Sequence, residues 1–242
     1  MKAIGVIPAR LGSTRLPRKM LREIEGVPLI VRVYRAVHSA QLLDEVIVAT
    51  DSPEIMQVCQ SEHCRVAMTS AEHRSGTERV REIANSIPAD VYMNIQGDEP
   101  LTRSEHVATL LKLMSDPAIQ IGTLKTPAGG EDIHNPCAVK VVTESNGKAL
   151  YFSRAAIPHD RDGTHPQYYK HLGFYAYRKP ALDRFVALPE SFLERSERLE
   201  QLRFLENGIA IFVAETPFDT VGLDTEEDLR RIEKILRASA AK

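Results

Sequence analysis

The sequence has no tryptophan, only three cysteines and no long hydrophobic run. A helix that crosses a bilayer needs about 20 mostly apolar residues, and no stretch approaches that length. The N-terminus enters a strand-like apolar run at once, without the pattern of a signal peptide. The cysteines are odd in number and lack the spacing of a metal site. These absences predict a cytoplasmic protein with free thiols and no insertion into a membrane.

An excess of charge of either sign is also missing. The formal net charge is −2, so nothing in the composition favours nucleic acid or an anionic membrane as a partner. The chain has 242 residues, of which 43% are hydrophobic and 26% charged. That is enough apolar material for one large domain with a substantial core.

The first half of the chain alternates between strand and helix signals. Short apolar runs of the kind that form buried strands are separated by stretches with helical spacing of apolar residues. Strands that alternate with helices predict an α/β fold with a mainly parallel, doubly wound, Rossmann-like sheet. We expect strands at residues 3–7, 45–50, 65–68 and 90–95, and helices that begin near Pro28 and cover residues 53–60 and 77–87.

The second half differs in character. Asn146-Gly147 lies between two apolar runs, at 139–143 and 148–152, and this pattern predicts a tight hairpin. A polar stretch with glycine and proline, at 159–169, predicts a loop or flap. We interpret residues 130–215 as a smaller α/β lobe within a single domain that spans 1–242. Strands at 172–177 and 209–214, and helices at 191–205 and after Thr225, complete the expected elements.

Several cations follow the first strand. Arg10, Arg15, Arg18 and Lys19 lie in one loop at the carboxyl end of that strand, where an open α/β sheet binds its ligand. The loop is not a P-loop, because it lacks the required glycines and Pro17 removes an amide. The cationic side chains would therefore hold the phosphates, and a nucleoside triphosphate is the anion we expect. The alternative is a solvated surface loop, since runs of charge are often simply exposed.

Two carboxylates have the positions of a metal site. Asp98 directly follows a predicted strand, and Asp224 directly precedes the last predicted helix. Two carboxylates form a minimal Mg²⁺ site when the phosphates of a substrate supply the other ligands. The alternatives are that Asp98 is a turn residue and Asp224 a helix cap.

Two further side chains are candidate ligand contacts. His171 precedes a predicted strand, and Arg154 at the end of the hairpin could anchor a carboxylate. A lone histidine is more often structural, and an arginine at such a place is often only exposed. Glu200 and Gln201 would by default lie on the solvated face of a helix. The sequence has no motif or Cys/His pairing typical of a hydrolase.

Longer stretches of the chain resemble one family, the 3-deoxy-manno-octulosonate (Kdo) cytidylyltransferases, also called CMP-Kdo synthetases. The resemblance spans nearly the whole chain, and its later stretches are more specific than the first, which other sugar-activating cytidylyltransferases share. The matching stretches are Ile-Pro-Ala-Arg10-x-x-Ser13-x-Arg15-Leu-Pro-x-Lys19, Val-Ala-Thr50-Asp51, His73-Arg74-Ser75-Gly76-Thr77-Glu78-Arg79, Gln96-Gly97-Asp98-Glu99-Pro100, Asn135-Pro136, Ala149-Leu150-Tyr151-Phe152-Ser153-Arg154-Ala155-Ala156-Ile157-Pro158, His171-Leu172-Gly173-Phe174-Tyr175-Ala176-Tyr177, Leu199-Glu200-Gln201-Leu202-Arg203 and Val221-Gly222-Leu223-Asp224-Thr225.

The resemblance implies a nucleotidyltransferase sheet and a Mg²⁺-dependent enzyme that joins CTP and Kdo into CMP-Kdo and pyrophosphate. It implies a cytoplasmic homodimer that serves lipopolysaccharide synthesis, with residues 130–215 as the sugar-binding and dimerisation lobe. Lys19, Asp98 and Asp224 would be catalytic, with both aspartates on the metal. Nucleotide contacts would come from Pro8, Ala9, Arg10, Ser13, Arg15, Lys19, Thr50, Asp51, Arg74 and Ser75, and substrate contacts from Gln96, Arg154, His171, Tyr175, Glu200 and Gln201.

Two alternatives remain open at this point. The chain could be a cytidylyltransferase for a related sugar acid, such as 8-amino-Kdo or sialic acid. It could also be a non-catalytic nucleotide-binding homologue, although a pure binder has no need of two metal-binding carboxylates.

Overall fold

The computed structural model describes residues 1–12 and 16–240, which divide into two compact units. The first unit comprises Met1–Val107 together with Thr220–Lys242, and the second comprises Ala108–Asp219. The chain thus leaves the first unit once and returns to it for its last helix. The second unit begins earlier than the lobe we expected at 130–215.

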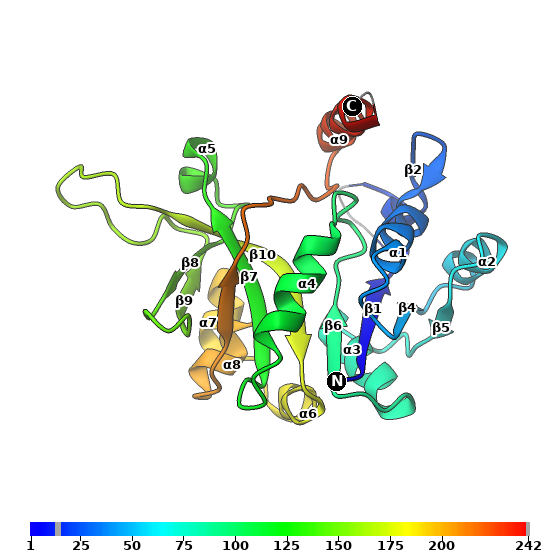
Figure 1. The fold of residues 1–242 in the computed structure, drawn as a ribbon, viewed down its shortest axis with the longest axis horizontal. Helices are drawn as coiled ribbons and strands as arrows, with labels where there is room; N and C mark the ends of the chain where they lie inside the picture. Colours follow the sequence, from blue (N-terminus) through cyan, green and yellow to red (C-terminus); the bar gives the residue numbers. More distant parts are fainter. Residues whose placement is uncertain (13–15, 241–242) are drawn as a thin grey trace. The chain divides into compact units, whose positions relative to one another are not determined.

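The first unit is built on a parallel sheet with the strand order β6-β1-β4-β5 (Figure 1). The central strand β1 (Ala3–Ala9) pairs with β4 (Glu45–Thr50) on one side and with β6 (Val91–Asn94) on the other. Strand β5 (Val66–Met68) extends the sheet beyond β4. Nearly every residue of β1, β4 and β6 is buried, as expected for parallel strands with both faces covered. The predicted parallel α/β fold is confirmed.

Three helices of this unit begin at a residue whose side chain caps the first turn. Pro53 lies in the first turn of its helix, and Ser52 accepts a hydrogen bond from the backbone of Ile55. The face of the first helix that carries Ile30 and Val33 is buried, in agreement with its helical spacing. The helices are α1 (Leu29–Ser39), α2 (Pro53–Ser61), α3 (Gly76–Ser86) and α9 (Glu226–Ala240).

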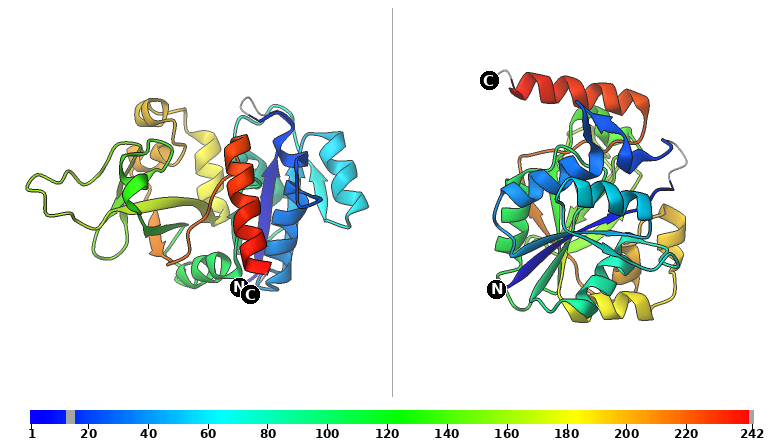
Figure 2. Two further views of the ribbon diagram at one scale, coloured as in Figure 1. Left: turned by 90° about the horizontal axis from the view of Figure 1, so that it is seen from above. Right: turned by 90° about the vertical axis from the view of Figure 1, so that its right-hand side faces the viewer.

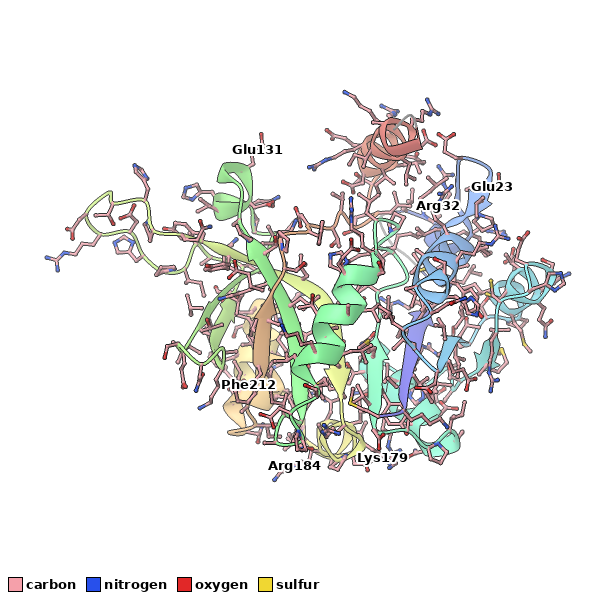
Figure 3. The ribbon with its side chains drawn as sticks, in the orientation of Figure 1. Glu23, Arg32, Glu131, Lys179, Arg184 and Phe212 are labelled. Carbon is pink, nitrogen blue, oxygen red and sulfur yellow. The ribbon has the colours of Figure 1, made fainter. Side chains whose placement is uncertain are left out.

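A small hairpin, which we had not expected, leads into α1. Its strands β2 (Glu23–Ile24) and β3 (Val27–Pro28) are joined by a turn in which Gly26 has a φ of 71°. That left-handed conformation favours glycine. Arg32 of α1 donates a hydrogen bond of 2.6 Å from Nη2 to the carbonyl oxygen of Ile24, which fixes the hairpin to the helix. Figure 3 labels Arg32 on the helix and Glu23 on the hairpin.

The last helix, α9, lies beside this hairpin, as the two views of Figure 2 show. Ion pairs join Arg22 to Glu226 at the start of α9 and Arg237 to Glu25 near its end. Because these pairs are exposed, each contributes little to stability. They connect the start and the end of α9 to the segment around the hairpin.

The second unit contains a mixed sheet. Its strand β7 (Ile121–Pro127) pairs antiparallel with β10 (Tyr169–Tyr177) and parallel with β11 (Phe212–Glu215). Strands β8 (Lys140–Thr143) and β9 (Ala149–Ser153) form an antiparallel hairpin, which joins the sheet through one pairing of β8 with β10. The hairpin predicted around Asn146-Gly147 is confirmed.

The helix predicted over residues 191–205 is wrong, because two short helices, α7 (Phe192–Glu197) and α8 (Leu202–Glu206), take its place. Arg198 ends α7 in the left-handed conformation, with a φ of 53°. Glu200 and Gln201 therefore lie in the break between two helices and not in the middle of one. The remaining helices are α4 (Ser104–Leu113), which crosses the boundary of the units, α5 (Gly130–His134) and α6 (Lys179–Ala187).

Residues 154–168 form no helix or strand, and Figure 1 shows this loop extending from the sheet of the second unit. This agrees with the loop predicted at 159–169, except that Tyr169 already belongs to β10. Asp160 orders the tip of the loop by accepting hydrogen bonds from the backbone of Thr164 and His165.

No helix within residues 1–12 and 16–240 is both long enough and apolar enough to cross a membrane. The three cysteines are free thiols, as expected. Cys59 and Cys64 are buried, and Cys137 is exposed.

Candidate functional site

The predicted phosphate-binding loop begins where β1 leaves the sheet. Arg10 is exposed, whereas Ser13 and Arg15 lie outside the described residues. Arg18 adopts the left-handed conformation and forms an exposed ion pair with a glutamate of α2. The next residue, Lys19, begins the short 3₁₀ helix η1 (Lys19–Leu21) and is only 9% exposed. The turn at Arg18 thus directs Lys19 into the protein.

Lys19 joins the two predicted metal ligands. Its Nζ lies 2.5 Å from Oδ2 of Asp98 and 3.0 Å from Oδ1 of Asp224, and it donates a hydrogen bond to each. All three residues belong to the first unit. The sequence positions of Lys19 and Asp224 differ by 205, yet the fold brings both to one point. We refer to Lys19, Asp98 and Asp224 as the Lys-Asp-Asp cluster.

Local backbone structure places each aspartate. Asp98 lies in the turn after β6, and its carbonyl oxygen accepts a hydrogen bond of 2.8 Å from the amide of Leu223. This bond ties the segment before α9 to the turn. Thr225 and Asp228 exchange hydrogen bonds at the start of α9 and so form a capping box. Asp224 therefore directly precedes Thr225, the residue that caps this helix.

Glycines allow close packing around the end of β1. A Cβ atom at Gly97 would lie 3.1 Å from the carbonyl oxygen of Pro8 and 3.2 Å from the sulfur of Met20. A Cβ at Gly76 would lie 3.3 Å from the ring of Pro8. Pro8 and the buried Ala9 are thus enclosed by the turn that carries Asp98 and by the start of α3.

The electrostatics of the cluster favour charge on the lysine. Burial alone lowers the pKa of Lys19, but the charges and hydrogen bonds of Asp98 and Asp224 outweigh it, and the pKa is raised above 10.5. Lys19 is therefore an ammonium ion at neutral pH. It neutralises part of the charge of two carboxylates that would otherwise repel each other.

Thr50 and Asp51 are two predicted nucleotide contacts. Thr50 ends β4, and Asp51, which follows it, contacts a buried arginine. Arg79 of α3 is 4% exposed and donates from Nη2 to Oδ2 of Asp51 at 2.7 Å. Its Nη1 donates to Oγ1 of Thr69 at 2.7 Å and to the carbonyl oxygen of Ser70 at 3.0 Å. Thr50 is fully buried. Arg79 thus holds together the loops that follow β4 and β5.

Arg74 and Ser75 lie at the start of α3. The hydroxyl of Ser75 accepts a hydrogen bond from the amide of Glu78, and the side chain of Glu78 accepts one from the amide of Arg74. The side chain of Arg74 is exposed, whereas Gln96, in the turn after β6, is half-buried.

In the second unit the predicted sugar contacts His171 and Tyr175 lie together on β10, with ring centres 5.4 Å apart. Nε2 of His171 lies 2.9 Å from Oγ1 of Thr123, and its ring meets that of Phe152 edge-on. Burial lowers the pKa of His171 to about 3, so this imidazole is neutral at neutral pH. Burial, together with the charge of Glu200, raises the pKa of Tyr175.

Gln201 precedes α8 and is buried, whereas Glu200 is half-buried. The side chain of Arg154 binds other partners. Its Nε donates to the carbonyl oxygen of Glu197 at 2.7 Å and its Nη1 to that of Pro136 at 2.9 Å. The guanidinium therefore already serves as a structural link between β9 and the end of α7.

Two residues of these sites were not singled out from the sequence. Arg79 lies in a stretch that matched the family, but nothing in the stretch indicates that it is buried against Asp51. Thr123, the partner of His171, carries no sequence signal, because the pairing depends on the register of β7 and β10.

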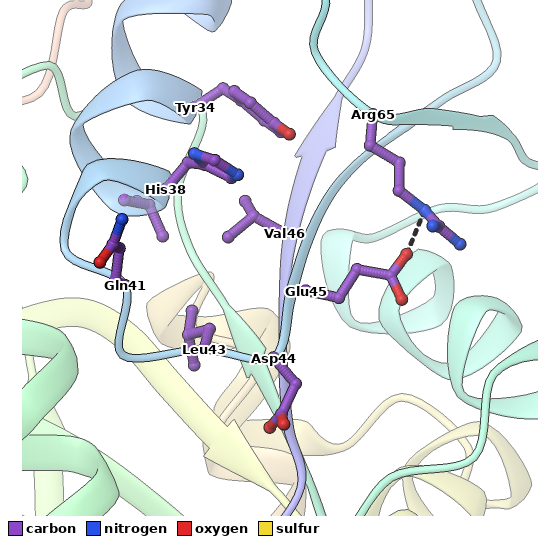
Figure 4. A pocket seen from close by; sticks show the side chains of 9 residues that line it. Tyr34, His38, Gln41, Leu43, Asp44, Glu45, Val46 and Arg65 are labelled. Carbon is purple, nitrogen blue, oxygen red and sulfur yellow. Dashed lines mark ion pairs between the residues drawn. The ribbon is translucent and has the colours of Figure 1, made fainter.

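A separate pocket of about 330 Å³ lies at the other end of β4 (Figure 4). Tyr34 and His38 of α1 stack in it with ring centres 5.5 Å apart, and Arg65 forms an ion pair with Glu45. Glu45 begins β4, whereas Thr50 ends it, so this pocket is distinct from the Lys-Asp-Asp cluster. None of the predicted site residues lines it.

Comparison with known proteins places the chain in a family. The family model described as cytidylyltransferase matches residues 4–211. A 3-deoxy-manno-octulosonate cytidylyltransferase of Koribacter versatilis is 64% identical over 98% of this chain and 91% of its own length. One from Acidobacterium capsulatum is 54% identical over 98% and 97%.

A solved structure is also closely similar. It is that of CMP:2-keto-3-deoxy-manno-octonic acid synthetase complexed with CTP, with a TM-score of 0.94 and 41% identity. The match covers 99% of this chain and 100% of the other. Such identity over almost the full length of both proteins exceeds what a shared fold alone requires. The chain belongs to the family of 3-deoxy-manno-octulosonate cytidylyltransferases.

Proposed function

We propose that this protein transfers the CMP group of CTP to the anomeric hydroxyl of Kdo, which gives CMP-Kdo and pyrophosphate for lipopolysaccharide synthesis. The observation that carries the proposal is the Lys-Asp-Asp cluster, in a chain that belongs to this family. The cluster joins a cation suited to phosphate with two carboxylates suited to a metal ion.

The nucleotide side of the reaction uses the first unit. Arg10 is exposed beside the end of β1 and is free to turn its guanidinium towards a phosphate. Lys19 supplies a buried positive charge, and the capped start of α3 presents Arg74 and Ser75. Thr50 and Asp51 complete the proposed nucleotide contacts, with Asp51 held by Arg79.

Magnesium is the metal that this donor set fits. Within the described residues no group of three or more His, Cys, Asp or Glu side chains could hold a metal ion. Asp98 and Asp224 both contact the same lysine nitrogen, so the two carboxylates converge on one small cation. Mg²⁺ is commonly held by one or two carboxylates together with substrate phosphates. We propose that Asp98 and Asp224 hold it here.

The chemistry follows from charge. When bound, Mg²⁺ would neutralise phosphate charge and lower the pKa of a coordinated hydroxyl. The hydroxyl of Kdo attacks the α-phosphorus in line and pyrophosphate leaves, without a covalent enzyme intermediate. Because both substrates are anions, the protein contributes mainly positioning and a fixed positive charge, the latter from Lys19.

The sugar side of the reaction would use the second unit. His171, neutral and fixed by Thr123, can form directed hydrogen bonds to sugar hydroxyls without adding charge. Tyr175 lies beside it, the charge of Glu200 acts on Tyr175, and Gln201 and Gln96 are further proposed contacts. Arg154 is better suited to holding β9 in place, because its guanidinium binds backbone carbonyls. We also propose a cytoplasmic homodimer that uses this unit for dimerisation.

Release of pyrophosphate from CTP tests the function. The purified protein is mixed with CTP, Mg²⁺ and Kdo, 8-amino-Kdo or sialic acid, and the sugar nucleotide is identified by mass spectrometry. We expect turnover with Kdo that stops when EDTA is added. No release with any sugar acid would refute the proposal, and preferred use of another acid would correct the substrate.

A matched pair of variants tests the role of the loop. Lys19→Ala should raise the KM for CTP more than the KM for Kdo, because it removes a charge meant for the triphosphate. Arg22→Ala removes a charge from the same segment, but the side chain of Arg22 pairs with Glu226 at the surface and should leave both constants unchanged. Equal effects of Lys19→Ala on both substrates would contradict the assignment.

A further inference from the structure

The side chain of Lys19 occupies the point on which both proposed metal ligands converge. It contacts Asp98 at 2.5 Å and Asp224 at 3.0 Å, and its side chain is 11% exposed. We propose that Lys19 is an internal counterion that competes with the divalent cation, so that the metal ion and the lysine ammonium exchange at these carboxylates. This inference rests on the proposed function, because it takes Asp98 and Asp224 as the metal ligands.

The exchange follows from electrostatics. Two carboxylates that share one site repel each other, and an ammonium ion between them offsets that repulsion. A divalent cation would offset this repulsion more strongly. It cannot, however, occupy so small a site together with the ammonium group of Lys19, because the two cations would repel each other at hydrogen-bond distance. The lysine must therefore move away when the metal ion binds to both carboxylates, and its charge lowers the affinity for the free metal ion.

A triphosphate would resolve the competition. Lys19 leaves the carboxylates at a cost, because its ammonium ion is buried and forms hydrogen bonds to both of them. Phosphate oxygens are negatively charged, as the carboxylates are, and so offer the lysine an alternative partner. The free protein should thus bind the metal ion weakly, and the metal ion should enter with the nucleotide. The Lys-Asp-Asp cluster would in this way bind the complex of metal ion and nucleotide in preference to the free metal ion.

Binding of Mn²⁺ alone, measured by electron paramagnetic resonance without nucleotide, tests the exchange. Lys19→Met removes the charge and keeps a side chain of similar length. We expect this variant to bind Mn²⁺ about tenfold or more tightly than the unaltered protein, because a like charge at contact distance has been removed. The same variant should use CTP less well, so the two affinities should change in opposite directions.

Arg22→Met is the matched control. It removes one positive charge three positions along the chain, where the partner is Glu226 and not Asp98 or Asp224. We expect its Mn²⁺ affinity to equal that of the unaltered protein. If Lys19→Met binds Mn²⁺ with unchanged or lower affinity, or if Arg22→Met shows an equal gain, the proposed competition is refuted.

A second measurement uses the unaltered protein and does not depend on a variant that folds. Acetylation of Lys19 by an N-hydroxysuccinimide ester is followed by peptide mass spectrometry, with the exposed Lys112 as an internal reference. Saturating Mn²⁺ should raise the rate at Lys19, because the metal ion releases the amine from both carboxylates, and leave Lys112 unchanged. An unchanged or lower rate at Lys19 would overturn the exchange.

The two proposals can fail separately. Turnover of CTP and Kdo without tighter Mn²⁺ binding in Lys19→Met would remove the competition and keep the function. Tighter Mn²⁺ binding without turnover on any sugar acid would support the competition and remove the function.

Discussion

The ion pair between Glu194 and Arg203 gives a sharp prediction about stability. Nε and Nη2 of Arg203 donate to the two carboxylate oxygens of Glu194 at 2.7 and 2.6 Å. The side chains of Arg203 and Glu194 are only 12% and 7% exposed. The guanidinium also lies 4.0 Å from the ring centre of Phe185. This pair connects α7 to α8 across the break that contains Glu200.

Arg203→Met should destabilise the protein severely. The variant keeps most of the apolar contact but leaves a buried carboxylate without its partner, and breaking a buried pair in this way costs about 3–5 kcal/mol. For a protein of this size that corresponds to a fall in Tm of roughly 6–20 °C. Lys179→Met, which breaks an exposed pair with Asp183, should cost less than about 1 kcal/mol.

Thermal unfolding followed by circular dichroism measures both variants. The double variant Glu194→Gln with Arg203→Met should recover part of the loss, because it no longer buries an unpaired charge. A fall in Tm for Arg203→Met no larger than that for Lys179→Met would refute the reasoning. So would a double variant less stable than Arg203→Met alone.

Three further predictions concern the proposed sites. Asp98→Asn should lower kcat by on the order of 10²–10³ in the pyrophosphate assay, as loss of one preorganised charged group does, and near-normal turnover would remove its metal role. Gly97→Ala should cost about 1–3 kcal/mol in urea unfolding, because its Cβ would press on the carbonyl of Pro8, and an unchanged midpoint would contradict that packing. Because the pKa of His171 falls to about 3 on folding, the unfolded chain binds its proton first, so stability should decline as the pH falls from about 6.5 towards 3. His171→Gln should flatten that decline in unfolding curves at pH 7 and pH 5, and an equally steep decline would show that another group causes it.

The parallel sheet and its helices could be predicted from the sequence because local signals agreed there with the fold. Buried strands are continuous apolar runs, and Pro53 and Ser75 mark helix starts through their own backbone chemistry. The hairpin turn at Gly147, with a φ of 86°, follows from a conformation that favours glycine.

Tertiary contacts decided the features that were missed. Strand β7 carries Gly122 and Lys125 and shows no clear alternation, so its place in the sheet depends on pairing with β10 and β11. The helix break at Arg198 involves a non-glycine residue in the left-handed conformation. The sequence around this break is typical of a helix. The buried partner of Arg203, Glu194, lies on the other side of the break.

The candidate site shows the same division. The sequence identified Lys19, Asp98 and Asp224 one by one, because each follows or precedes a recognisable element. It could not indicate that the lysine contacts both aspartates, since that depends on how the turn after β6 and the start of α9 pack together. The structural use of the Arg154 guanidinium was equally invisible, because its partners are backbone carbonyls.

The return of the chain to the first unit at Thr220 has a consequence during synthesis. The ribosome makes Lys19 and Asp98 early, but Asp224 only after the entire second unit has been made. A nascent chain can thus complete its parallel strands while it still lacks one of the two acids that share the lysine. Catalytic competence would accordingly appear in a single late step of translation.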